Sequence, residues 1–210
     1  MKSSSNQSRP WRIAVLISGS GRTLANLMAC IERGEIDAEI VTVVSSAEGV
    51  RGLEIAAAAG IPTHTLTPKD ARGADNYSAA MYQLLTPYDV DLVVMAGFLR
   101  RLLVHAGWEN RILNIHPALL PQAAEYAAGK GFYGDRVHAA VLEHGDSESG
   151  ATVHVVTDSY DEGPPLGQCL VPVLEDDTVR SLADRVFASE CDLYPSTIRD
   201  YMAAHPELKR

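Results

Sequence analysis

The stretch that decides the fold class is "WRIAVLISGSGRTLANLMACIER", residues 11–33. Residues 11–18 form a continuous apolar run with β-branched character, which is typical of a strand buried on both faces. A Gly-Ser-Gly turn follows, and apolar residues spaced three and four positions apart in residues 23–33 predict a helix that stops at Gly34. A buried strand, a glycine turn and a helix in this order indicate the first unit of an α/β sheet.

The same alternation continues along the chain to Pro121. Strands are predicted at residues 38–46, 61–66, 91–97 and 111–116. Helices are predicted between them at residues 50–60 and 76–85. Strands that alternate with helices form parallel sheets whose helices cover both faces. We therefore expect an α/β protein with a Rossmann-like, mostly parallel sheet.

Beyond Pro121 the pattern changes. A helix that stops at Gly145 is followed by two alternating strands at residues 150–158 and 167–174, and then by a long helix from about residue 178 towards residue 202. Pro172 cannot donate to a sheet ladder, which favours an edge position for the last strand. We expect this part to add antiparallel strands and a long helix to the sheet.

The composition is that of an ordinary globular protein, and the 210 residues fit a single domain over residues 11–205. A formal net charge of −9 without any basic block disfavours nucleic acid as a partner. No apolar run is long enough to cross a bilayer. The polar N-terminus lacks a signal peptide, and we expect residues 1–10 to be a disordered leader.

Cys30, Cys169 and Cys191 are far apart and odd in number. This spacing predicts neither a disulfide framework nor a zinc site, so no metal is expected. Reduced cysteines in a chain without a secretion signal favour a cytoplasmic location.

The Gly-rich turn contains Gly19, Ser20 and Gly21 and leads into Arg22 and Thr23 at the start of a helix. Glycines and free helix N–H groups suit a bound anion. The third glycine of a dinucleotide fingerprint and the Gly-Lys-Ser/Thr of a P-loop are both missing. A single phosphate monoester is the better chemical match, and a tight turn without a ligand is the alternative.

A second candidate site follows the strand in "LNIHPALLP", residues 113–121. Asn114 and His116 are two residues apart and therefore project from the same face, and Pro117 ends the strand. Ligands of open α/β sheets bind at the carboxyl ends of the strands. An amide and an imidazolium at that place can stabilise an oxyanion. The alternative is a polar pair satisfied within the core.

The loop in "VHVVTDSYDEGPP" supplies two carboxylates, Asp158 and Asp161, that can tune the imidazole. Either acid can instead be a solvated or turn-capping residue. His154 lies on the alternating strand just before this loop, where it is either a core histidine or a member of the site.

Five segments resemble the folate-dependent formyltransferases, in particular those that formylate glycinamide ribonucleotide in purine biosynthesis. They are "SGSGRTL", "DLVVMAGFLRRL", "LNIHPALLP", "GATVHVVTDSYDEGP" and "ASECDLYP", in the order and approximate spacing of that family. The resemblance covers approximately residues 12–202. It implies 10-formyltetrahydrofolate as the formyl donor, a small-molecule acceptor, and a monomer or homodimer.

The resemblance also implies roles for the residues. Asn114 and His116 would bind the formyl oxygen as it becomes an oxyanion, while Asp161 would keep His116 charged and help to pass a proton from the attacking amine to the folate. The turn from Gly19 to Thr23 would hold the substrate phosphate, and Glu190 would lie near its ribose. The folate pocket would be formed by Phe98, Leu99, Arg100, Arg101, Leu102, Val156 and Asp158. Residues 11–121 would then be a nucleotide-binding half and residues 122–205 a folate-binding C-terminal half.

Three features depart from the family pattern. Arg22 and Thr23 stand where Ser or Thr followed by Asn is usual, and Phe187 stands where a basic residue is frequent. The link after Pro121 is longer and reads as a mobile flap, residues 122–135. These differences keep open a formyltransferase that acts on another amine, such as an amino-sugar nucleotide. A catalytically silent folate- or nucleotide-binding module is the other alternative. Related enzymes that act on tRNA or hydrolyse the donor carry additional domains, which disfavours them.

Overall fold

The protein is described by a computed structural model that covers residues 9–71, 73–129 and 131–210. Residues 1–8 of the expected leader therefore lie outside the described residues. Arg9 differs from the expectation, because its guanidinium pairs with both carboxylate oxygens of Asp91, at 2.6 and 2.9 Å. The fully buried Asp91 carboxylate also accepts hydrogen bonds from the backbone N–H groups of Arg12 and Arg210. One acid thus ties both ends of the described chain to the sheet.

The sheet has seven strands in the order β3-β2-β1-β4-β5-β6-β7. The parallel strands are β1 Trp11–Ile17, β2 Ala38–Ser45, β3 Thr63–Thr65, β4 Leu92–Met95 and β5 Ile112–His116. The antiparallel strands are β6 Glu148–Val155 and β7 Pro165–Pro172, and β7 forms an edge. The expected fold class is confirmed. The order reverses between β1 and β4, which is where open α/β sheets form ligand crevices.

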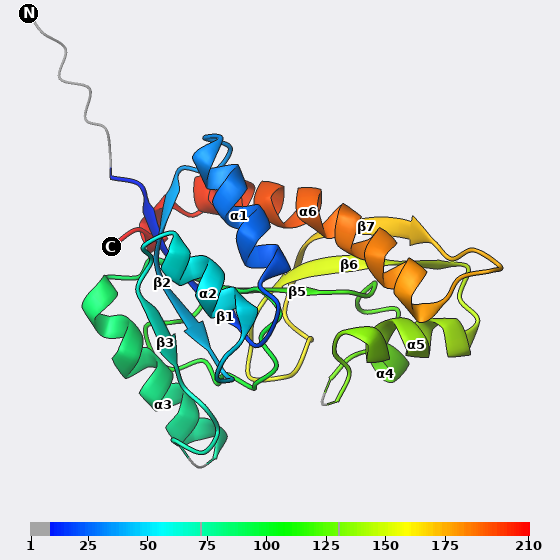
Figure 1. Cartoon of the computed structure of the whole chain (residues 1–210), viewed down its shortest axis with the longest axis horizontal. Coiled ribbons are helices and arrows are strands. Elements are labelled where there is room, and N and C mark those ends of the chain that lie inside the picture. The colour runs from blue at the N-terminus through cyan, green and yellow to red at the C-terminus, as the bar shows by residue number, and fades with distance from the viewer. Residues whose placement is uncertain (1–8, 72, 130) are drawn as a thin grey trace, which may run out of the picture.

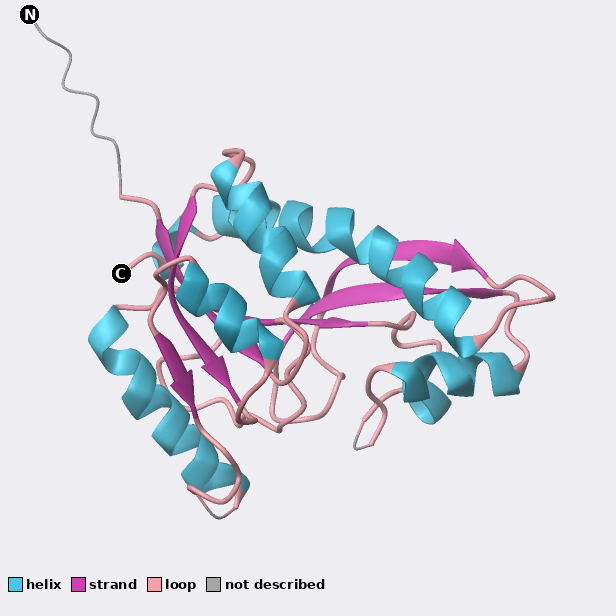
Figure 2. Cartoon of the chain, in the orientation of Figure 1, coloured by secondary structure: helices cyan, strands magenta, loops and turns pink. Residues whose placement is uncertain are grey.

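Helices cover both faces of the sheet (Figure 2). They are α1 Arg22–Glu32, α2 Arg51–Ala58, α3 Ala74–Leu85, α4 Ala124–Ala127, α5 Asp135–His144 and α6 Val179–Ala204, with short 3-10 turns at Thr86–Tyr88 and Pro206–Leu208. Alternate residues of β1 divide between the two faces. Ile13 and Val15 pack with α1, α5 and α6, whereas Ala14 and Leu16 pack with α3. Burial on both faces explains the continuous apolar run in β1.

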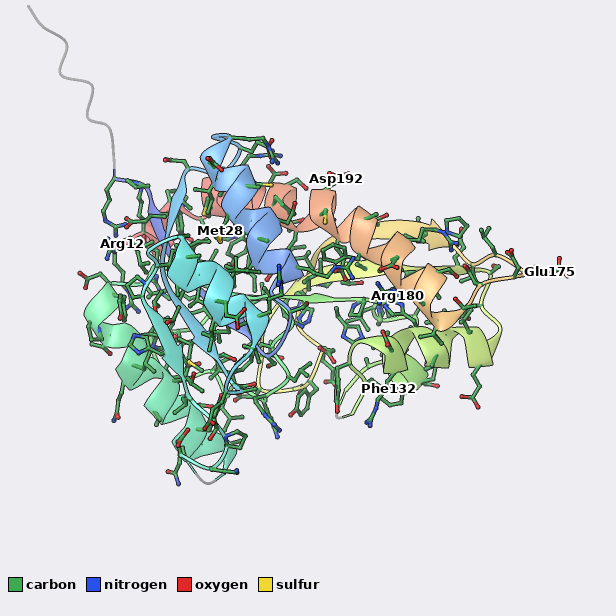
Figure 3. The ribbon with its side chains drawn as sticks, viewed as in Figure 1. Arg12, Met28, Phe132, Glu175, Arg180 and Asp192 are labelled. Atoms are coloured by element: carbon green, nitrogen blue, oxygen red, sulfur yellow. The ribbon has the colours of Figure 1, made fainter. Side chains whose placement is uncertain are left out.

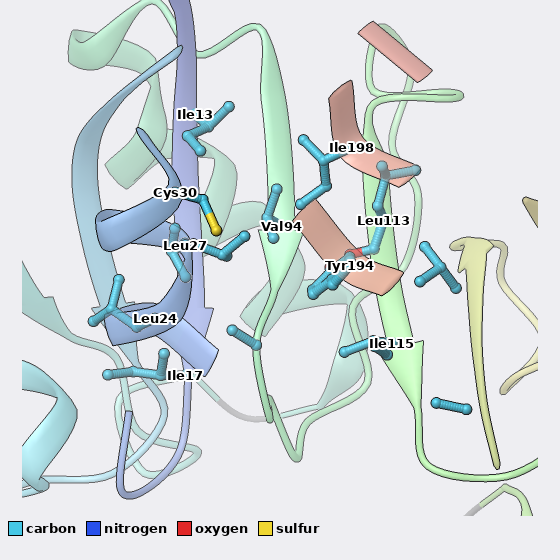
Figure 4. Packing of buried hydrophobic residues seen from close by; sticks show 14 of the residues in the cluster. Ile13, Ile17, Leu24, Leu27, Cys30, Val94, Leu113, Ile115, Tyr194 and Ile198 are labelled. Carbon is cyan, nitrogen blue, oxygen red and sulfur yellow. The ribbon is translucent and has the colours of Figure 1, made fainter. Parts of the chain in front are cut away.

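Helix α6 crosses the face that carries α1 (Figure 1). Its fully buried Tyr194 packs among residues of β4 and β5 (Figure 4), and the Tyr194 hydroxyl lies 3.0 Å from the carbonyl oxygens of Met95 and Leu113. Pro195 lies inside the helix and cannot donate to the carbonyl of Cys191 four residues earlier. The side chain of Asn26 in α1 donates to that carbonyl instead, at 2.8 Å. The two helices are therefore joined where α6 lacks a hydrogen bond of its own.

The flap begins with a helical turn, α4, that no sequence pattern predicted. Tyr126 stacks on His144 of α5 with ring centroids 3.9 Å apart, and its hydroxyl donates to Asp146. This packing holds the first part of the flap against α5. Residue 130 of the flap lies outside the described residues. No helix among residues 9–71, 73–129 and 131–210 is long and apolar enough to span a membrane.

Candidate active site

A cavity of about 550 Å³ opens at the carboxyl ends of the central strands. The predicted residues that line it come from the oxyanion pair, the folate segment and the substrate group: Asn114, His116, Asp161, Phe98, Leu99, Arg100, Arg101, Leu102, Val156, Asp158, Arg22, Thr23 and Glu190. Gly19, Ser20 and Gly21 are not among the lining residues, although they immediately precede Arg22. The structure thus brings most of the predicted residues to one place.

The imidazole of His116 is buried and oriented by the flap. Its Nε2 lies 2.7 Å from the carbonyl oxygen of Ala127, which can only accept, so Nε2 carries a proton. The other ring nitrogen, Nδ1, lies 3.8 Å from Oδ1 of Asp161. The backbone of the flap therefore selects the tautomer and leaves Nδ1 facing the acid.

Asp161 accepts a hydrogen bond from the backbone N–H of Gly129 at 2.9 Å through Oδ2. Its φ of 55° is unusual for a residue other than glycine and indicates a backbone held by its surroundings. Burial alone would raise the pKa of Asp161, but the neighbouring rings of His154 and His116 and the N–H of Gly129 together lower it. The carboxylate is therefore available as a negative charge and as a proton acceptor.

The side-chain amide of Asn114 is oriented by His154, which is directly opposite it in the β5–β6 ladder. Nδ1 of His154 lies 3.0 Å from the carbonyl oxygen of Val155 and donates to it. In the protonated ring Nε2 pairs with Oδ1 of Asp161, 3.6 Å away, whereas in the neutral ring Nε2 accepts from Nδ2 of Asn114 at 3.1 Å. This pairing uses one of the two amide hydrogens and leaves the second available to a ligand. His154 is thus a member of the site, and not an isolated core histidine.

The surroundings of His116 oppose the positive charge that is expected for it. Burial lowers the pKa of His116, and the opposing effects of Asp161 and the Ala127 carbonyl do not restore it to its ordinary value. Burial therefore favours the neutral imidazole over an imidazolium held by Asp161. A nearby negative charge would reverse this balance, because it stabilises the protonated ring.

The predicted folate segment forms one wall of the cavity. Phe98 lies near the ring of Tyr77, with centroids 6.5 Å apart, and the backbone N–H of Leu99 donates to the hydroxyl of Ser18 at 2.8 Å. Asp158 joins this wall to the loop after β6. Its carboxylate accepts from the N–H of Val104, and its carbonyl accepts from Arg101. Asp158 therefore fixes the shape of the pocket through the backbone.

The Gly-rich turn has a structural reason for one of its glycines. Gly21 has a φ of 73°, and a Cβ added there would lie 2.5 Å from the Cα of Gly52 at the start of α2. The N–H of Gly52 also donates to the carbonyl of Gly19 at 3.1 Å. Helix α1 has no side-chain cap at its amino end, so its first N–H groups are left for water or an anion.

Glu190 lies on α6 in the cavity wall and forms no hydrogen bond within the described residues. Burial raises the pKa of Glu190 to about 7, and the nearby positive charge of Arg22 opposes the rise. At neutral pH this carboxyl group is close to its pKa, and no described group of the protein donates a hydrogen bond to it. Such a group suits a ligand with hydroxyl donors.

Several lining residues were not assigned to the site from the sequence. Phe132 and Tyr133 contribute from the flap, and Figure 3 labels Phe132 just before α5. His138 on α5 is buried, and its Nδ1 has no hydrogen-bond partner in the described part of the chain. The aromatic residues of the flap carried no periodic signal. Within those same described parts, no group of three or more His, Cys, Asp or Glu side chains is arranged to hold a metal ion.

Comparison with known proteins places this geometry in a family. The formyl transferase family model matches residues 11–198. The chain is 36% identical over 198 residues to the chloroplastic phosphoribosylglycinamide formyltransferase of Arabidopsis thaliana, covering 93% of this chain and 66% of that protein. It is 38% identical over 198 residues to the trifunctional purine biosynthetic protein adenosine-3 of Gallus gallus, covering 92% of this chain but only 18% of that protein.

Solved structures show the same similarity. Glycinamide ribonucleotide transformylase 1 of Symbiobacterium toebii superposes with a TM-score of 0.81 at 40% identity, covering 92% of this chain and 88% of that one. The phosphoribosylglycinamide formyltransferase of Coxiella burnetii superposes with a TM-score of 0.82 at 33% identity, covering 93% and 89%. The chain belongs to the formyl transferase family.

Proposed function

We propose that the protein transfers the formyl group of 10-formyltetrahydrofolate to the amine of glycinamide ribonucleotide, a step of purine biosynthesis. The observation that carries the proposal is that Asn114, His116 and Asp161 line one cavity together. The predicted folate segment, Arg22 and Glu190 line the same cavity. The names of the similar proteins support the same acceptor.

The protein supplies an oxyanion site and a proton acceptor. When the amine attacks the formyl carbon, a C–N bond forms and the carbonyl oxygen becomes negative. The free amide hydrogen of Asn114 donates to that oxygen. The developing charge also favours uptake of a proton from solvent at Nδ1 of His116, which then donates to the same oxygen and returns its proton to solvent when the intermediate collapses. Asp161 takes the proton that the attacking nitrogen releases, either directly or through a water molecule.

Collapse of the intermediate breaks the bond between the formyl carbon and the folate nitrogen. That nitrogen receives the proton held at Asp161, so one proton leaves the amine and one reaches the departing folate. The chain needs no covalent intermediate, because the amine is itself the nucleophile. The products are formylglycinamide ribonucleotide and tetrahydrofolate.

The acceptor binds with its phosphate at the amino end of α1. The N–H groups of the first turn and the guanidinium of Arg22 supply the positive potential there. Glu190, which lines the same cavity close to Arg22, accepts from ribose hydroxyls. This arrangement places the amine towards His116 and the folate towards Phe98 and Arg100.

The proposal is tested by turnover of the purified protein with both substrates, followed as release of tetrahydrofolate. His116→Ala and Asp161→Asn are each expected to lower kcat at least about a hundredfold, the scale for a positioned oxyanion or proton-transfer group. His205→Ala, near the C-terminus and away from the cavity, is the matched control and retains activity. Near-normal rates in both site variants would refute the mechanism.

The same assay separates the alternatives. A silent binding module binds the folate and the nucleotide, as measured by calorimetry, without turnover in the unmodified protein. An enzyme for another amine forms tetrahydrofolate with an amino-sugar nucleotide but not with glycinamide ribonucleotide. The proposed function requires the opposite preference.

A further inference from the structure

The guanidinium of Arg22 lies over the ring of Phe187. Its Cζ is 3.7 Å from the ring centroid, which is close for a cation–π contact. Arg22 begins α1 and Phe187 lies on α6, so the contact joins two elements far apart in the sequence. Both residues line the large cavity, beside Thr23 and Glu190.

The acidic neighbour of Arg22 holds it only weakly. Nη1 and Nη2 of Arg22 are each 3.4 Å from Oδ1 of Asp184, near the outer limit for a hydrogen bond. Asp184 has a shorter bond elsewhere, because its Oδ2 accepts from Nε of Arg180 at 2.7 Å. The side chains of Arg22 and Asp184 are both about half exposed, at 48% and 45%, so water screens their attraction. The ring, more than the acid, therefore sets the plane of the guanidinium.

We propose that Phe187 is a positioning residue that holds Arg22 with the edge of its guanidinium free for the phosphate of the acceptor nucleotide. An aromatic ring covers one face of a guanidinium and leaves its N–H donors in the plane, where they reach phosphate oxygens. The uncapped amino end of α1 supplies further N–H donors at the same place. The inference rests on the proposed function, because it names how that acceptor is held.

The proposal predicts a specific kinetic pattern. Phe187→Leu keeps an apolar side chain but removes the ring, and the KM for glycinamide ribonucleotide should rise about two- to fivefold, which corresponds to about 0.5–1 kcal/mol for an exposed cation–π contact. The kcat and the KM for the folate should stay within about twofold of the unmodified values. Phe187→Tyr retains a ring face and should restore the nucleotide KM.

Arg22→Ala removes the charge itself, and the nucleotide KM should rise about tenfold or more, the scale of a hydrogen bond to a charged group. In the double variant, Phe187→Leu should add nothing further, because the ring then has no guanidinium to hold. Arg180→Ala is the matched control, since it removes the stronger partner of Asp184 on the same helix without touching the cavity lining. It should leave the nucleotide KM unchanged.

Three results would overturn the proposal. The first is that Phe187→Leu raises the nucleotide KM equally with and without Arg22. The second is that Phe187→Tyr fails to restore this KM, and the third is that Arg180→Ala raises it as much as Phe187→Leu does. Calorimetry with glycinamide ribonucleotide, without folate, separates a failure of the proposed function from a failure of the positioning role. If the unmodified protein does not bind this nucleotide, the proposed function and the positioning role both fail. Binding that is equally tight in Phe187→Leu refutes the positioning role alone.

Discussion

Glu190→Gln should make the protein more stable at neutral and alkaline pH. The raised pKa means that the folded protein binds the proton of this carboxyl more tightly than the unfolded chain does. The free energy of unfolding therefore falls as the pH rises from the unfolded value, 4.5, through about 7, and this loss remains above that pH. Glutamine has nearly the same shape and no charge to bury, so the variant avoids the loss.

The magnitude follows from the two pKa values. At 1.36 kcal/mol for each pKa unit, a rise from 4.5 to about 7 corresponds to about 3 kcal/mol as an upper value. The side chain retains some contact with solvent in the cavity, so about 2 kcal/mol is the expected difference at pH 8. Near pH 4 the two proteins should be almost equally stable, because Glu190 is then protonated in both the folded and the unfolded states.

Urea unfolding of both proteins between pH 4 and pH 8.5 measures this difference directly. Glu143→Gln changes an exposed acid on α5 and is the control, whose difference from the unmodified protein should not vary with pH. A difference between Glu190→Gln and the unmodified protein that is constant over the pH range would refute the reasoning. The proposed contact with the ribose predicts a concurrent rise in nucleotide KM of about tenfold, so stability would be gained at the expense of binding.

The other predictions concern packing and the orientation of the site. Gly21→Ala should lower the free energy of unfolding by about 1–3 kcal/mol, because its positive φ and the close backbone of α2 both disfavour a Cβ. A Cβ at Gly19 meets no atom within 4 Å, so Gly19→Ala should lower it by less. Thermal melts compare the two variants. Asn26→Ala leaves the Cys191 carbonyl without its donor and should cost about 1–3 kcal/mol in urea unfolding. His154→Ala removes the partner that orients the side-chain amide of Asn114. Steady-state kinetics should show kcat lower by about ten- to hundredfold with little change in nucleotide KM, and an unchanged kcat would contradict the orienting role.

The fold was predictable because its signals are local. The buried run of β1 needs no knowledge of its neighbours, and the alternation of strands and helices determines most of the sheet. The shared face of Asn114 and His116 follows from the period of a strand, and both residues do line the cavity. Their catalytic roles remain predictions.

The rest depends on contacts between distant segments. His154 faces Asn114 because of the β5–β6 register, which an antiparallel pairing can choose in more than one way. The protonation of His116 depends on how deeply the whole fold buries it. Helix α4 is too short for a periodic pattern, and its aromatic contact with α5 holds it in place.

The flap contacts His116 and Asp161 through its main chain. The carbonyl of Ala127 orients His116, and the N–H of Gly129 binds Asp161. Every amino acid offers this carbonyl, and every one except proline offers the N–H. Substitutions in this segment can therefore alter the side chains that line the cavity while His116 and Asp161 keep their orientation. The lining of the cavity can thus change with one surface loop while the two contacts from its backbone are kept.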